Sequence, residues 1–97
     1  MVVLGRAEVR ATFKIPKHGF IAGCYVVEGE IRRNAKARVL RQTEVKFEGE
    51  FASLKHHTED VREIRQGFEC GIGLKGFNDI KVGDQIECFT TELVPVA

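Results

Sequence analysis

Apolar and polar side chains alternate without interruption along residues 6–15. The apolar set of this segment is Ala7, Val9, Ala11, Phe13 and Ile15. A period of two places these side chains on one face of a β-strand and the charged or threonine side chains between them on the other face. The segment therefore predicts a half-buried antiparallel strand. We expect Pro16 to end it, because proline has no N–H to donate to a sheet ladder.

Further short strands, separated by turns, are predicted along most of the remaining chain. They lie at residues 20–29, 37–41, 44–54, 67–74 and 85–93. Gly49 interrupts the third of these segments and indicates a hairpin or a bulge there. The loop before the last strand carries Ile80 and Val82, both of which we expect to be buried.

Residues 55–67 are the one helix-like segment. Val61 and Ile64 lie three positions apart, and acidic residues precede basic ones. An isolated helix this short is unstable, so we expect a turn or a single helical turn. A chain of short strands with almost no helix predicts a barrel or a sandwich. Glycines inside several strands favour the barrel, since a small barrel must bend at such positions.

Length, charge and cysteine content narrow the class of protein. Ninety-seven residues suit one domain. The net charge of +1, from 15 basic and 14 acidic side chains, argues against a whole-domain electrostatic grip on nucleic acid, so any RNA contact must be local. No apolar run approaches the length of about 18 residues that a membrane span needs. The odd number of cysteines argues against a complete disulfide framework and fits free thiols in the cytosol.

Neither a metal centre nor an enzyme active site is predicted. The possible metal ligands are Cys24, Cys70, Cys88, His18, His56 and His57. They include no C-x-x-C pair, and the side chains of the two adjacent histidines are expected on opposite faces of a strand. Buried cysteines that act as small apolar residues are the alternative, above all for Cys88. The sequence has no nucleophile elbow, phosphate-binding loop or H-E-x-x-H motif, and no cofactor is expected.

Two basic segments remain as candidates for RNA contact. Residues 30–41 carry five basic side chains and one acidic one, but by itself this composition favours a solvated hairpin. Lys55, His56 and His57 combine a cation with two rings. Such a set suits a nucleotide through stacking and phosphate contact, and a polar strand end is the alternative interpretation.

Four blocks of sequence resemble one protein family. AEVRATFK, IAGCYVVEG, SLK followed by EDVREI, and GFECGIGLKGFNDIKVGDQIE are similar to the C-terminal domain of bacterial translation initiation factor two. The resemblance extends from Gly5 to Glu92. It implies an all-β fold, a closed six-stranded antiparallel β-barrel similar to the second domain of elongation factor Tu. Residues 1–5 would then be a linker or the start of an excised piece, 6–92 the barrel and 93–97 a C-terminal tail.

The resemblance also implies a function. The domain would bind the formylmethionyl acceptor end of initiator tRNA and recognise its blocked α-amino group. It would not be an enzyme, because the GTPase centre would lie in another domain of a parent protein. A cytoplasmic monomer that reaches the ribosome through the parent factor is expected, without a membrane partner. The alternative is a barrel that docks on the ribosome, or couples to a GTPase domain, without reading the aminoacyl group.

The family's contacts to formylmethionine can be carried over by matching motif. They are Cys24, Lys55, His56, His57, Glu69, Cys70 and Gly71. Relatives often have an arginine and then an aromatic residue where this chain has His56 and His57. Histidine is only partly charged near neutral pH, so the cationic role is expected to fall to Lys55 and the stacking role to His57.

A small pocket with apolar walls would explain how the blocked amine is recognised. Formylation turns an ammonium, whose ordinary pKa is about 7.7–8.0, into a neutral amide, and burying an unpaired charge is unfavourable. Cys24 and Cys70 are suitable walls, and the glycines of residues 67–73 indicate close approach to the backbone. Glu69 would attract the unwanted ammonium. We therefore expect a nearby cation to hold it, or its carboxylate to bond the ribose or the backbone.

Overall fold

Strands make up nearly all of the regular structure in this chain. The computed structural model describes residues 2–15, 19–57, 59–77 and 79–90, so Pro16, His18 and the predicted tail at 93–97 lie outside it. The strands are β1 (Val2–Ile15), β2 (Gly19–Arg32), β3 (Lys36–Arg41), β4 (Glu44–His56), β5 (Glu59–Asp60), β6 (Glu63–Arg65), β7 (Glu69–Leu74) and β8 (Gln85–Thr90). Within these ranges, no helix is long and apolar enough to cross a membrane.

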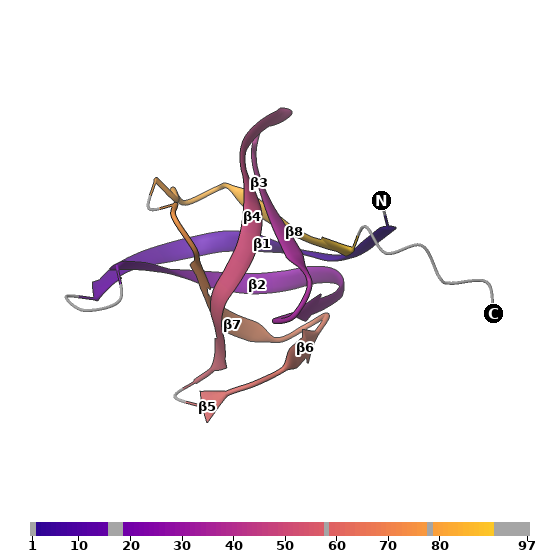
Figure 1. Cartoon of the computed structure of the whole chain (residues 1–97). Helices are drawn as coiled ribbons and strands as arrows, with labels where there is room; N and C mark the ends of the chain where they lie inside the picture. The colour runs from indigo at the N-terminus through magenta and orange to yellow at the C-terminus, as the bar shows by residue number, and fades with distance from the viewer. Residues whose placement is uncertain (1, 16–18, 58, 78, 91–97) are drawn as a thin grey trace.

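Six of the strands form a closed antiparallel barrel. Each is hydrogen-bonded to the next in the order β1-β8-β3-β4-β7-β2, and β2 pairs again with β1 (Figure 1). Closure leaves these strands without a free edge that could pair with another chain. The short β5 and β6 pair with β4 and β2 outside the ring. The predicted all-β class and six-stranded barrel are confirmed.

The barrel interior is filled by small and β-branched side chains from alternate strand positions. Ala7 and Val9 of β1 are buried there, as their alternation predicts. The prediction is wrong for Phe13, which is 54% exposed. The register between β1 and β2 shifts between Val9 and Ala11, and β1 pairs with β8 only as far as Glu8. This shift makes Arg10 an extra residue in β1, so that Ala11 and Phe13 lie on the opposite face of the strand from Val9 and Phe13 does not enter the core.

β4 is one continuous strand, so of the hairpin or bulge predicted within residues 44–54 the hairpin is wrong, whereas register shifts of the bulge kind are present, although not at Gly49. Gly49 does not break the strand: a Cβ at this position would lie 2.5 Å from the Phe47 ring, so the ring occupies the space above the glycine. The irregularities fall instead where Val39 and Leu40 pair with β4 and between Phe51 and Ser53. The actual hairpin joins β3 to β4 (Figure 1).

Residues 55–67 contain short strands and not the expected helical turn. The Val61 N–H donates to the carbonyl of Leu54 over 3.0 Å, and Ile64 pairs with Ile31 in the β2–β6 ladder. Ile64 reaches the core from extended backbone. The spacing of three therefore resembles a helical pattern, although Ile64 packs from β6 and Val61 packs from the position directly after β5.

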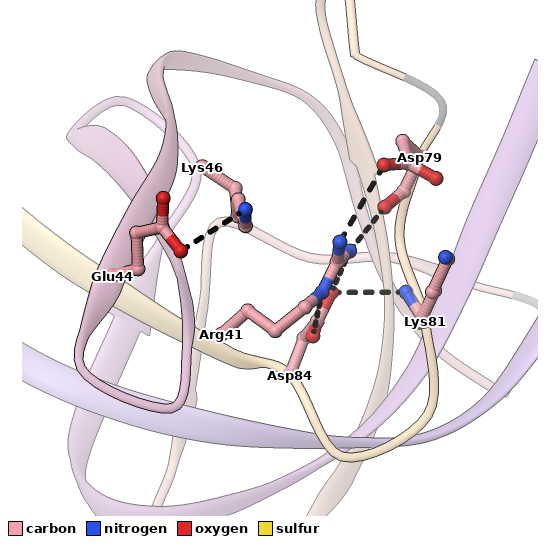
Figure 2. Close-up of polar contacts among 6 residues, drawn as sticks. All are labelled: Arg41, Glu44, Lys46, Asp79, Lys81 and Asp84. Atoms are coloured by element: carbon pink, nitrogen blue, oxygen red, sulfur yellow. Dashed lines mark hydrogen bonds and ion pairs between the residues drawn. The ribbon is translucent and has the colours of Figure 1, made fainter.

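The loop before β8 is held by a buried ion pair (Figure 2). Asp84 is 2% exposed, and its two carboxylate oxygens each lie 2.9 Å from a nitrogen of Arg41 on β3. Arg41 also donates to the carbonyl of Asp79 over 2.7 Å. Ile80 is buried as predicted, but Val82 is 65% exposed. The ion pair and backbone bonds anchor this loop, so Val82 is not needed as an apolar contact.

Candidate functional site

A pocket of about 390 Å³ opens where β1, β2, β4 and β7 meet. Six of the seven predicted contact residues line it; they are Cys24, Lys55, His57, Glu69, Cys70 and Gly71. We call it the cysteine pocket. Three sequence blocks that are far apart along the chain therefore contribute to one concave surface.

Strand register explains why these residues meet. β2 and β7 are neighbours, with Cys24 opposite Cys70 and Gly23 opposite Gly71. β7 also pairs with β4, where Gly71 lies opposite Lys55. Side chains at directly opposed positions share one face of a sheet. The register alone thus brings the two thiols together on one face of the sheet, and it places Lys55 beside Gly23 and Gly71 on the other face, since successive residues of a strand point to opposite sides.

The two thiols are neutral and belong to the barrel core beneath the pocket. Cys24 is 2% and Cys70 5% exposed. Burial, and then the nearby Cys70, raises the pKa of Cys24 well above its usual value. Burial raises the pKa of Cys70 to about 12. Both thiols therefore stay protonated at neutral pH, and neither can offer a negative charge to a ligand.

Within residues 67–73, glycine is favoured at each of its three positions for a different structural reason. Gly67 has φ +92° in a turn, with nothing within 4 Å of a Cβ, a conformation that favours glycine. A Cβ on Gly73 would lie 2.6 Å from the Ser53 hydroxyl oxygen. Gly71 alone of the three lines the cysteine pocket, and a Cβ there would lie 3.3 Å from Ile21. The predicted close approach to the backbone therefore applies to Gly71.

The two histidines have different environments. His57 has φ +58°, a left-handed conformation that is uncommon for residues other than glycine. This turn brings its ring to 4.2 Å from the ring of His56, so the expected opposite orientation is wrong. The His56 Nδ1 lies 2.9 Å from the carbonyl oxygen of Glu69 and donates to it. His56 thus supports the backbone of β7 and does not line the pocket, whereas His57 does.

Charged side chains surround the rim of the pocket. Arg10 lies over the ring of Tyr25 at 4.9 Å and pairs with Glu8 at 3.2 Å. Lys55 and Glu69 are exposed, and in the described ranges neither forms an ion pair within 4.0 Å. We expect a nearby cation to hold Glu69, or its carboxylate to bond the ribose or the backbone. This expectation stays a prediction for the ligand-bound pocket.

Sequence reasoning missed the contribution of β1 and part of β2. The additional lining residues are Arg10, Ala11, Phe13, Ile21, Gly23 and Tyr25. A Cβ on Gly23 would lie 3.1 Å from the Phe13 ring, so this glycine lets the ring cover the strand. A glycine inside an otherwise apolar strand was the sequence signal for such a contact, but the pattern did not identify its partner.

A second depression of about 490 Å³ adjoins the cysteine pocket. Phe13, Ile21 and Lys55 line both depressions. Ser53 and Gly73 are on its floor, and Asp60 contributes a carboxylate. A ligand larger than one amino acid could therefore extend from the cysteine pocket into this second depression, past Phe13 and Ile21.

Cys88 lies away from this surface. The Arg32 N–H donates to its sulfur over 3.2 Å, and the thiol lies 3.7 Å from the carbonyl oxygen of Arg32. It is fully buried, in line with its interpretation as a small core residue. All three cysteines are free thiols. Among the described residues, no three His, Cys, Asp or Glu side chains are grouped as metal ligands would be.

One known protein family matches most of the chain. The family model for elongation factor Tu domain 2 matches residues 19–87. The translation initiation factor IF-2 of Moorella thermoacetica is 62% identical over 91 residues, 94% of this chain and 10% of that protein. The protein of the same name from Caldanaerobacter subterraneus subsp. tengcongensis is 61% identical over 94 residues, 97% of this chain and 13% of that protein. This chain thus spans about a tenth of the length of the curated relatives it matches.

Proposed function

We propose, from the premise that this chain belongs to the elongation factor Tu domain 2 family, that its barrel binds the formylmethionyl acceptor end of initiator tRNA. The curated relatives are named translation initiation factors. The observation that carries the proposal is the cysteine pocket, in which Gly23 and Gly71, backed by two neutral buried thiols, lie beside an exposed cation and an exposed ring. Such a pocket suits an uncharged amino acid attached to a nucleotide.

Selection against an unblocked amine follows from the neutral surface that the two glycines and the buried thiols behind them provide. The ordinary pKa of an α-amino group is about 7.7–8.0, so free methionyl ester is largely cationic at neutral pH. Cys24 and Cys70 cannot neutralise that cation, because burial keeps both of them protonated. The formylated amine is a neutral amide and can enter without this penalty. Gly71 has no side chain to block approach, so the formyl amide can lie directly against the strand.

The remaining parts of the ligand would contact the rim. The exposed Phe13 and the half-buried Ile21 offer apolar surface to the methionine side chain, and thioethers pack favourably at aromatic edges. His57 offers a ring on which the terminal adenine can stack, an interaction worth about 1–3 kcal/mol. Lys55 and Arg10 are the cations available to the terminal phosphate.

Glu69 is proposed to bond the terminal ribose, or to be held by Lys55 or Arg10 once ligand is bound. Its backbone is fixed from behind by His56, while its side chain is exposed at the rim. A carboxylate on the rim can accept from a ribose hydroxyl without facing the amine. His56 is therefore a positioning residue in this proposal and not a ligand contact.

The wider role would belong to a longer factor. Family membership places this chain among β-barrel domains. We propose that a GTPase centre lies elsewhere in the parent protein, that the parent brings this barrel to the ribosome, and that it acts as a monomer in the cytoplasm.

Titration of two esters tests the proposal. Binding of N-formylmethionyl-adenosine and of methionyl-adenosine would be measured by calorimetry at pH 7, with backbone amide shifts recorded in parallel. We expect the formylated ester to bind roughly 100-fold more tightly, because the ammonium loses hydration worth several kcal/mol without a counter-charge. Shifts should centre on Cys24, Lys55, His57 and residues 69–71. Equal binding of the two esters, or shifts away from this pocket, would favour a barrel that docks without reading the aminoacyl group.

Three variants refine the test. Lys55→Gln should weaken binding of both esters when a 5′-phosphate is added to the adenosine. Lys46→Gln, on the same strand but outside the pocket, should not. Glu69→Gln should leave the preference for the formylated ester nearly unchanged. A large gain in preference would show that this carboxylate faces the amine, contrary to the proposed ribose contact.

A further inference from the structure

A second concave surface lies apart from the cysteine pocket and shares no lining residue with it. It holds about 840 Å³, and we call it the basic groove. Its basic side chains come from the end of β2, the turn that follows it, the start of β3, and the segments before β6 and after β7. They are Arg32, Arg33, Lys36, Arg62 and Lys75. Its acidic side chains are Glu50 and Glu63.

Charge is unevenly distributed between this groove and the rest of the chain. The groove holds five of the fifteen basic side chains but only two of the fourteen acidic ones. The remaining residues are therefore net acidic, although the whole chain is nearly neutral. A local concentration of positive charge on a neutral domain attracts an anion to that surface alone.

The two acidic residues neutralise some of these cations and not others. Glu50 lies 3.9 Å from the amine of Lys36 and 3.5 Å from that of Lys75. Arg32 is held by Glu30 at 2.6 Å, with Glu63 at 3.8 Å. In the described ranges, no carboxylate pairs with Arg33 or Arg62 within 4.0 Å. The uncompensated charge of the groove is thus concentrated on these two arginines.

Arg33 and Arg62 are held side by side by the fold. The Arg33 N–H donates to the Arg62 carbonyl over 2.9 Å. The Arg33 guanidinium also donates to the carbonyl of Ala52 over 3.3 Å, which anchors it to β4. A guanidinium bonds phosphate through two parallel donors, so the pair suits a phosphodiester.

We propose that the basic groove binds the phosphate backbone of an RNA. The inference rests on the proposed function in one respect, since it supposes an RNA whose end occupies the cysteine pocket. β4 connects the two surfaces: Glu50 lines the groove and Lys55 the pocket. Five positions of an extended strand span about 17 Å, so an acceptor end in the pocket places its following nucleotides within reach of the groove.

The lining chemistry favours RNA over an acidic peptide. The apolar members of the groove are Ala35 and Phe51, and Phe51 is 4% exposed. Protein partners are usually held by aromatic or apolar anchors that enter open pockets, and this groove offers none. Phosphate contacts fix the position of an RNA without reading its sequence, so we expect binding that is independent of base sequence.

The test uses an RNA hairpin with a single-stranded 3′ end and no amino acid. Its binding would be followed by fluorescence anisotropy over a series of salt concentrations. Arg33→Gln combined with Arg62→Gln should weaken binding about tenfold, and should lower the slope of log K against log salt by about 1.4 to 1.8, because each lost phosphate contact contributes roughly 0.7–0.9. The matched control, Lys46→Gln combined with Lys81→Gln, removes two charges that line neither surface and should change the slope much less.

Separate readouts keep the two proposals distinguishable. The arginine variant should bind N-formylmethionyl-adenosine as the unmodified protein does, and its thermal melting should be unchanged. An unaltered salt slope, or equal effects of the arginine variant and its control, would overturn the groove proposal. Polyglutamate that binds as tightly as the hairpin, with equal sensitivity to the arginines, would overturn the choice of RNA. Failure of the ester titration beside a positive slope result would remove the aminoacyl proposal alone.

Discussion

His57 is the residue at which local preference and site geometry conflict most clearly. Its φ of +58° lies in the left-handed region, where a side chain with a Cβ is disfavoured. Backbone outliers of this kind persist only where the surroundings impose them, and they gather at functional sites. Here the outlier turns the imidazole onto the rim of the cysteine pocket and against His56. The conformation is thus the means by which this strand end presents a ring.

Replacement of His57 should separate stability from ligand affinity. His57→Gly removes both the ring and the backbone strain, whereas His57→Ala removes the ring alone. We expect the glycine variant to be more stable than the alanine variant by about 1 kcal/mol in urea unfolding. Both should bind N-formylmethionyl-adenosine about tenfold more weakly, since a stacking platform is lost. Equal stability of the two variants would show that the left-handed turn carries no strain.

Individual site residues could be predicted to the extent that they lie on paired strands. Cys24 and Cys70 belong to sequence blocks that the β2–β7 register places directly opposite each other. Arg10 and Tyr25 could not be found in this way. Their contact across the pocket rim depends on the register shift after Val9, and no pattern in the sequence marks that shift. His56, at the position next to a true lining residue, supports β7 from outside the pocket.

At the scale of elements, the loop before β8 depends on one buried carboxylate. Burial by itself would raise the pKa of Asp84, but the hydrogen bonds and charge of Arg41 and the N–H of Lys81 outweigh it, and the pKa lies below its usual value. The Asp84 carbonyl also accepts from Val9 over 2.8 Å, and this bond ties the loop to β1. Asp84 therefore joins the loop before β8 to β3 through the ion pair (Figure 2) and to β1 through its backbone carbonyl.

Asp84→Asn should be the more damaging of two substitutions in this loop. It leaves Arg41 without its buried partner, which we expect to lower the free energy of unfolding by about 2–3 kcal/mol. Asp79→Asn is the control: its side chain is 64% exposed and lies 3.5 Å from Arg41, so a loss below about 1 kcal/mol is expected.

The decrease of the free energy of unfolding at acid pH provides a second test of the role of Asp84. The carboxylate has a lower pKa in the folded state, so its contribution is complete above the unfolded pKa of about 3.9 and is lost as the pH falls through the folded pKa. Urea unfolding between neutral and acid pH should therefore show a smaller pH-dependent loss in Asp84→Asn than in the unmodified protein. The same loss of unfolding free energy at acid pH in both proteins would show that Arg41 does not stabilise the ionised form of Asp84.

Most elements could be predicted from period-two patterns, and the exceptions have physical reasons. The alternation in β1 correctly identifies Ala7 and Val9 as core residues. It fails at Phe13, because the register shift after Val9 turns the positions that follow it to the outer face. Val61 and Ile64 imitate a helix, since a spacing of three also occurs when an irregular bend separates two short strands. Local periodicity does not record which neighbours the closed barrel supplies.

At the scale of the whole molecule, three buried thiols make stability sensitive to alkaline pH. Burial raises the pKa of each cysteine in the folded state, and for Cys88 a hydrogen bond from Arg32 offsets only part of this effect. In the unfolded chain thiols ionise near pH 8.5. The folded state therefore retains protons that the unfolded state loses as the pH rises, and the free energy of unfolding falls above that pH.

The expected fall is up to about 1.4 kcal/mol per pH unit for each thiol. It would be measured by urea unfolding at several pH values between neutral and about pH 10, below the range in which lysine and tyrosine titrate fully. A variant with alanine at Cys24, Cys70 and Cys88 starts from lower stability but should show a flatter curve. Parallel curves for the two proteins would contradict the raised thiol pKa values.

Closure of the barrel has a consequence for synthesis of the protein. β1 pairs with β8, which brings Val2 opposite Thr90, so the ring is completed by strands from opposite ends of the described chain. Contacts between such distant residues form slowly.

While the chain is being made, β1 and β3 each have an edge that only β8 will cover. The strands that form the cysteine pocket, β1, β2, β4 and β7, are all made earlier. A nascent chain can therefore assemble the cysteine pocket while it still exposes two open edges, and the last strand protects the chain from aggregation but contributes no lining residue to that pocket.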